Sequence, residues 1–207
     1  MFGNILKNLA SIVLAAIVIT PAAGRMECLR ADVEVTVEFS EPVVSIDNSK
    51  ADLPDRFGDI SANFKIKYLL DTSLITKTYG KKPERCLTLE GLKVRVGYDY
   101  DIRIDKNFKP GSCEYDAVMA HELDHKNAYE SILADFRDRI EKTLQQAALT
   151  VAPVRPAGEN TDKYMDRILS EIKNNPEWKL LLREIELESD IKNNHIDSGP
   201  DYMENCR

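Results

Sequence analysis

The chain has 207 residues, of which 43% are hydrophobic and 30% are charged, and its formal net charge is −7. This length suits one domain. The acidic balance argues against a nucleic-acid partner, because proteins bind the phosphate backbone mainly through an excess of lysine and arginine.

The first residues have the pattern of a secretory signal. Lys7 precedes the apolar run Leu9–Ile19, and Pro21-Ala22-Ala23 supplies small residues for cleavage. We therefore expect a signal peptide over residues 1–23, one mature domain over residues 24–207, and a periplasmic or secreted location with no membrane span after signal cleavage. The apolar run is short for a span. An uncleaved anchor remains an alternative, because the small-residue pattern is imperfect.

All four cysteines follow this segment, at positions Cys28, Cys86, Cys113 and Cys206. An even number in an exported protein predicts two disulfides, with three possible connectivities. We favour Cys86 with Cys113, because both border the strands that precede a long helix, and this leaves Cys28 and Cys206 to join the two ends. Zinc-thiolate binding is the alternative, but the chain has no C-x-x-C spacing.

The first half of the mature chain is predicted to be rich in β-strands. Val33–Phe39 alternates between apolar and polar residues, as a strand with one buried face does. Phe64–Leu69 is a second candidate strand. Leu92–Val96 and Tyr100–Ile104 predict a hairpin that turns near Tyr98-Asp99. We expect these strands to form an N-terminal antiparallel β-sheet.

A long helix is predicted to follow the strands. Ser112 is a candidate N-cap. The run from there to Leu149 contains no proline or glycine, and its apolar residues recur at helical spacing. Two prolines and a glycine within 151–159 predict a turn. Helical stretches over about 161–173 and from Pro176 to about Asn193 would complete a C-terminal helical hairpin, so the expected fold class is α+β.

The long helix carries His121-Glu122-Leu123-Asp124-His125, which is the H-E-x-x-H pattern of zinc peptidases. Residues four apart share one helix face, so both imidazoles can bind one Zn²⁺. Glu122 points about 100° away from His121, and we expect it to be the catalytic base that takes a proton from the attacking water. The structural alternative is a pair of core histidines bonded to backbone carbonyls. A di-iron site would need a second E-x-x-H unit, and Lys192 stands three residues before His195.

A catalytic zinc needs a third protein ligand and one open position. If the last helix runs antiparallel to the motif helix at equal rise per residue, the motif faces roughly residues 184–188. The candidates are Glu184, Glu186, Glu188, His195 and Asp197. We favour Glu188 as the third metal ligand, because it lies close to the apolar face of its helix.

These features together resemble a family. The signal, the β-rich first half, Ser112-Cys113-Glu114-Tyr115, the motif, and Asn194-His195-Ile196-Asp197 followed by Tyr202 are similar to secreted bacterial zinc metallopeptidases of the HExxH (zincin-like) type, built on a domain of unknown function. The resemblance covers most of the mature chain, but only the motif is specific. It implies zinc ligation by His121 and His125 with Glu122 as base, and it leaves the third ligand open. Asp124 stands where the motif often has glycine.

The expectation is therefore a zincin-like α+β protein of the cell envelope that uses Zn²⁺ to hydrolyse peptide bonds in a peptide or protein substrate. An upstream strand, within Leu92–Ile104, would pair with the extended substrate. The alternative is a non-catalytic envelope binding protein with a structural metal. A closed site with four protein ligands would favour that alternative, whereas an open fourth position would favour the enzyme.

Overall fold

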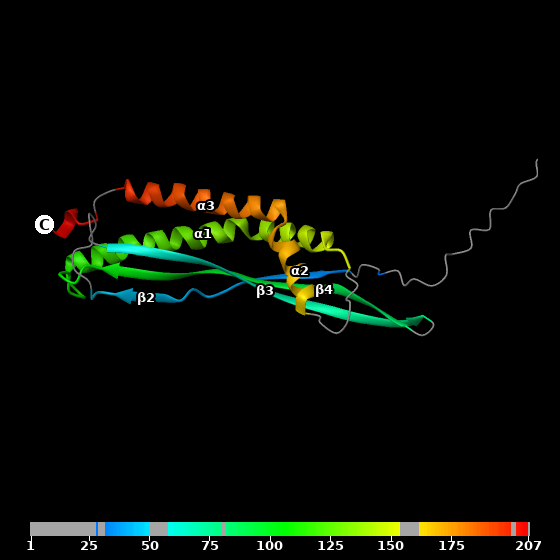
Figure 1. Cartoon of the computed structure of the whole chain (residues 1–207). Helices are drawn as coiled ribbons and strands as arrows, with labels where there is room; N and C mark the ends of the chain where they lie inside the picture. Colours follow the sequence, from blue (N-terminus) through cyan, green and yellow to red (C-terminus); the bar gives the residue numbers. More distant parts are fainter. Residues whose placement is uncertain are drawn as a thin grey trace, which may run out of the picture.

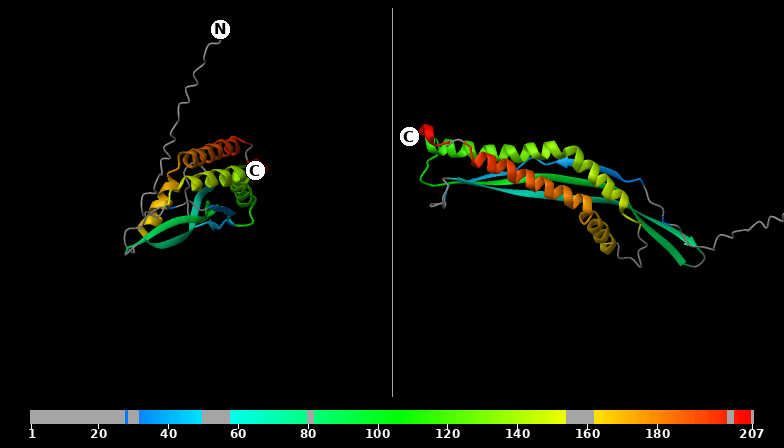
Figure 2. Two further views of the ribbon diagram at one scale, coloured as in Figure 1. Left: turned by 90° about the vertical axis from the view of Figure 1, so that its right-hand side faces the viewer. Right: turned by 90° about the horizontal axis from the view of Figure 1, so that it is seen from above.

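The computed structural model describes residues 28, 32–49, 58–79, 82–153, 162–199 and 202–206, so the predicted signal over residues 1–23 lies outside the described residues. One sheet is covered on one face by helices (Figures 1 and 2). Its strands are β1 (Glu34–Phe39), β2 (Val44–Asp47), β3 (Gly58–Tyr79) and β4 (Lys82–Ile104). The helices are α1 (Cys113–Thr150), α2 (Asp162–Lys173), α3 (Pro176–Asp197) and the short 3₁₀ helix η1 (Glu204–Cys206).

Strand β4 is the centre of the sheet. Its inward-facing side chains are aliphatic or aromatic at every second position, which is the pattern that suits a half-buried strand. They are all buried: Leu92, Val94, Val96, Tyr98, Tyr100, Ile102 and Ile104. This alternation continues through Tyr98-Asp99, so the predicted hairpin turn at that point is wrong and β4 is one strand of 23 residues.

The predicted antiparallel sheet is also wrong. Strands β1 and β2 both pair with β4 in parallel, with Glu34 opposite Gly91 and Val44 opposite Tyr100. Strand β3 runs antiparallel to β4, on its other edge. Apolar alternation determines which face of a strand is buried, but it carries no information about the direction of the neighbouring strand. The fold is nevertheless of the α+β kind.

Helix α1 packs along one face of the sheet (Figure 1). Its bounds confirm the helix predicted from Ser112 onwards. The Ser112 Oγ accepts a hydrogen bond from the Tyr115 N–H at 3.2 Å, as an N-cap does. Its buried side includes Ile132, Ile140 and Leu144, which pack on the inner face of the sheet.

Helix α3 runs back along α1 in the opposite direction (Figure 1). Pro176 occupies its first turn, as the sequence predicted, and the Asn175 side chain caps the helix. Trp178 is fully buried, and its indole N–H donates to the Tyr68 hydroxyl at 2.8 Å. This contact anchors the start of α3 on β3, while α2 contributes Ile168 and Ile172 to the same core.

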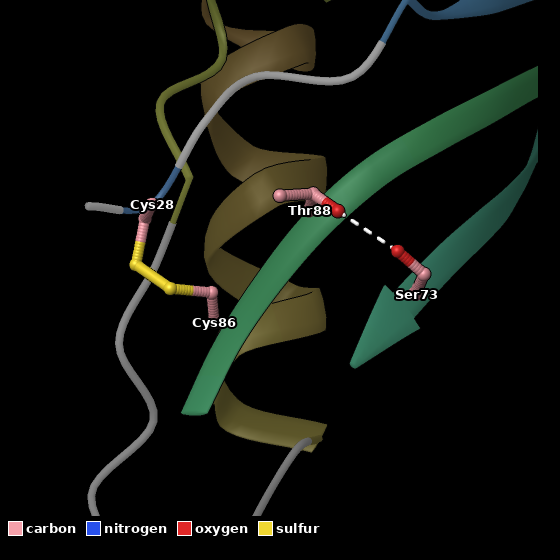
Figure 3. Close-up of a disulfide and its surroundings, with 4 residues drawn as sticks. All are labelled: Cys28, Ser73, Cys86 and Thr88. Carbon is pink, nitrogen blue, oxygen red and sulfur yellow. Dashed lines mark hydrogen bonds between the residues drawn. A yellow bond between two sulfur atoms is a disulfide. The ribbon is translucent and has the colours of Figure 1, made fainter. Parts of the chain in front are cut away.

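Two disulfides join Cys28 to Cys86 and Cys113 to Cys206, and the preferred pairing of Cys86 with Cys113 is wrong. Figure 3 shows the first bridge, near the hydrogen bond between Ser73 and Thr88. Cys86 lies 18 residues before the end of β4, which is about 60 Å at about 3.3 Å per residue. A disulfide joins Cα atoms less than about 7 Å apart, so Cys86 cannot reach the start of α1.

Within the described residues, no helix has both the length and the apolar character that crossing a membrane requires. Two disulfides are consistent with an extracytoplasmic protein, because oxidising compartments preserve them.

Candidate metal centre

The two motif histidines come together near the start of α1. His125 is 5% exposed, and the His121 side chain is 21% exposed. Their Nε2 atoms lie 3.1 Å apart, with the ring planes close to perpendicular. The four-residue spacing thus brings two imidazole nitrogens to one point, as the sequence predicted.

Asp197, in the last turn of α3, completes a group of three. Its Oδ1 lies 3.5 Å from the His121 Nε2 and 3.3 Å from the His125 Nε2. Two ligand atoms at about 2.0–2.1 Å from a tetrahedral zinc are separated by about 3.3 Å. The three distances in this group are close to that value, so the donor atoms fit one zinc ion.

Asn193 holds His125 in the orientation that such a site needs. Its side-chain oxygen lies 2.7 Å from the His125 Nδ1, and its amide nitrogen donates to the Ser189 carbonyl at 2.7 Å. The second bond orients the Asn193 amide, so the His125 Nδ1–H is the donor in the first one. The Nε2 lone pair of His125 is then directed at the group of three.

Glu122 is on a different side of α1 from the metal group. It is 4% exposed and faces the beginning of β3, where a Cβ atom built on Gly58 would lie 2.8 Å from the Glu122 Oε1. The close approach of helix and strand depends on glycine at this position. Glu122 is not a member of the group of three.

A C-terminal segment lies against the start of α1 (Figure 1). The Tyr202 ring meets the His121 ring edge-on at 4.8 Å, and its hydroxyl donates to the Asp124 Oδ2 at 2.7 Å. This hydrogen bond raises the pKa of the Tyr202 hydroxyl, because the hydroxyl can donate it only while it is protonated. The Cys113–Cys206 disulfide attaches the same segment to α1.

The structure gathers Asp197, and not the favoured Glu188, with the histidines. Among the described residues, only His121, His125 and Asp197 form a group that could hold a metal ion, and Glu186 and His195 are not in it either. Glu184 pairs with Arg139, farther along α1.

The reason is the register of the two helices. Helix α2 is a separate element, so the antiparallel contact with α1 begins only at α3. His125 therefore faces Asn193, about two helix turns beyond the expected 184–188.

Comparison with protein-family models, with curated proteins and with solved structures found no match to this chain. Two imidazoles and one carboxylate are a set of three ligands, and the partial exposure of His121 and Asp197 gives solvent access to them.

Proposed function

We propose that this chain is a zinc-dependent peptidase that acts in the periplasm or after secretion. The observation that carries the proposal is the convergence of His121, His125 and Asp197, with Glu122 next to them on the same helix but outside their group. Three protein ligands are typical of a catalytic zinc, whereas structural zinc sites usually have four.

Each residue of the site would have a separate role. His121, His125 and Asp197 would hold a zinc ion, which when bound polarises a carbonyl and lowers the pKa of water. Glu122 would accept the proton of the attacking water and later donate it to the departing amine. Asn193 would keep His125 in the required tautomer.

An extended substrate would pair with β3. Strand β4 has partners on both edges over 91–96 and 100–103, so the strand expected to bind substrate is not available there. Within the part of the chain that the structure describes, β3 pairs only with β4. Because Gly58 at the start of β3 contacts Glu122, a peptide on the outer edge of β3 would run towards the base.

A non-catalytic envelope protein with a structural metal is the second candidate. The burial of Glu122 against Gly58 favours it, because a carboxylate packed on the sheet must reach towards the substrate to act as a base. The Tyr202 ring against His121 also favours it, since it narrows the approach to the site.

The substitution Glu122→Gln separates the two candidates. It keeps the shape of the side chain and removes the basic carboxylate, so we expect zinc content to persist while peptide hydrolysis falls by about 10²–10⁴-fold. Zinc would be measured by elemental analysis, and hydrolysis on a fluorogenic peptide library.

Two controls make the result interpretable. His121→Ala should lose both zinc and hydrolysis, whereas Glu177→Gln, an exposed change on α3, should lose neither. Wild-type hydrolysis no faster than that of Glu122→Gln would favour the binding protein. Loss of zinc in Glu122→Gln would make Glu122 a ligand and contradict the mechanism.

A further inference from the structure

A cavity of about 400 Å³ opens beside the metal centre, between β3, β4, α1 and α3. Its aromatic and charged linings come from different elements. The strands and α1 supply aromatic rings, and α3 supplies Leu182 and Ile185 together with charged side chains. A pocket of this size with mixed walls is suited to an elongated organic group.

The cavity begins one helix turn from His125 on α1 and one helix turn from Asn193, the partner of His125, on α3. On α1, Tyr129 follows His125 by four residues; on α3, Ser189 precedes Asn193 by four. One turn is about 6 Å, which is about two residues of an extended peptide. A peptide bond held at the metal centre would therefore bring the side chain of a nearby residue to this cavity.

Three aromatic rings line the cavity and lie close together. The ring centroids of Phe64 and Tyr98 are 5.0 Å apart, and those of Tyr98 and Tyr129 are also 5.0 Å apart. The faces of aromatic rings carry partial negative charge and attract cations. Leu182 and Ile185 extend the apolar surface, which would accommodate an aliphatic stem.

The charged lining is acidic on balance. Glu186 and Asp190 contribute two carboxylates against the single guanidinium of Arg183. Burial raises the pKa of the Tyr98 hydroxyl most strongly, and the charge of Glu186 raises it further. Burial also raises the pKa of Tyr129, and Asp190 adds to that. Both carboxylates therefore lie near enough to the rings to act on a group bound among them.

We infer that this cavity binds the side chain of a lysine or arginine residue of the substrate, close to the bond that is cleaved. The aliphatic stem would lie on Leu182 and Ile185, and the cationic end would lie among the rings and the carboxylates of Glu186 and Asp190. The net charge of −7 would also favour the approach of cationic peptides. This inference rests on the proposed peptidase function.

The test measures binding, so that it does not depend on hydrolysis. Zinc-loaded full-length Glu122→Gln protein would be titrated with fluorescent peptides that differ at one residue, which is lysine, norleucine, phenylalanine or glutamate. Norleucine keeps the stem of lysine without its charge. We expect the lysine peptide to bind about tenfold more tightly than the norleucine peptide by fluorescence anisotropy.

Two double variants with equal charge change show whether the cavity causes this preference. Glu186→Gln/Asp190→Asn should reduce it to less than about twofold. Asp166→Asn/Glu177→Gln, at exposed positions away from the cavity, should keep it. Equal binding of lysine and norleucine peptides, a preference for phenylalanine, or no binding of any peptide would each overturn the inference, as would a lysine preference that survives in the cavity variant.

Hydrolysis by the wild-type protein distinguishes this failure from failure of the proposed function. Cleavage that does not depend on the varied residue, together with equal binding, would support the peptidase proposal and contradict the subsite. A lysine preference that depends on the cavity, without any cleavage, would support the binding site and contradict the peptidase proposal.

Discussion

At the scale of single residues, some residues of the candidate metal centre could be predicted from the sequence and others could not. His121 and His125 were predictable because their spacing and the helical period are local properties of the sequence. Asp197 was only one of five candidates, because its position depends on how α3 is placed along α1. Asn193 was not predicted, since nothing distinguishes an asparagine bonded to His125 from the exposed Asn194 beside it.

The third ligand can be tested by comparing two acids. Asp197→Asn should lower zinc affinity by more than about 100-fold, because loss of a direct ligand exceeds the effect of losing a supporting residue. Glu188→Gln should leave the affinity unchanged, since Glu188 is outside the group of three. Competition with a zinc-binding dye measures both values, and equal affinities for the two variants would remove Asp197 from the ligand set.

The hydrogen bond between His125 and Asn193 can be tested separately. Asn193→Leu should lower zinc affinity by about 10–100-fold, because the His125 Nδ1–H loses its acceptor. Asn193→Asp retains an acceptor and should retain the affinity. The exposed Asn194→Leu serves as control. Co²⁺ absorption spectra would detect the altered ligand geometry in Asn193→Leu alone, and identical spectra in all three variants would mean that Asn193 does not orient the ligand.

At the scale of elements, the sequence predicted the buried face of a strand or helix better than it predicted which strands pair and in which direction. The alternation in β4 and the cap and apolar seam of α1 were visible, because each depends on residues close in the chain. The parallel pairing of β1 and β2 with β4 was not visible, since alternation is the same in either direction. The predicted hairpin turn within β4 was wrong because strands usually have five or six residues, whereas β4 has 23.

The contact between α1 and β3 depends on Gly58. A Cβ atom at this position would lie 2.3 Å from the Val118 Cγ1, so Gly58→Ala must push the helix from the strand. We expect a loss of about 1–3 kcal/mol in the free energy of unfolding. Gly91→Ala, whose Cβ has its nearest neighbour at 3.1 Å, should cost less than about 1 kcal/mol. Urea denaturation measures both, and equal stability of the two variants would contradict the tight contact.

At the scale of the whole molecule, the two disulfides act on different regions. Cys28–Cys86 lies on the part of the sheet remote from the metal centre, whereas Cys113–Cys206 attaches the segment that carries Tyr202. The even number of cysteines is visible in the sequence, but their pairing is not, because the pairing depends on the length of β4.

Removing either bridge should destabilise the fold, but only one should affect the metal. Cys28→Ser/Cys86→Ser and Cys113→Ser/Cys206→Ser should each lower the free energy of unfolding by about 2–5 kcal/mol, because each bridge closes a long loop. Only the second pair should speed zinc release, measured by transfer to a chelator. A non-reducing peptide map checks the pairing first; finding Cys86 joined to Cys113 would refute the structure at this point.

The three candidate ligands lie on two helices, α1 and α3, so a metal site there would be completed only late in folding. The ribosome delivers both histidines while α2 and α3 are still unmade, and two ligands alone hold zinc weakly. Stable binding of zinc would have to wait until Asp197 has been synthesised and α3 has packed on α1. Zinc uptake would then report the completion of folding rather than initiate it, and a bound ion would favour the finished state over every partly folded one.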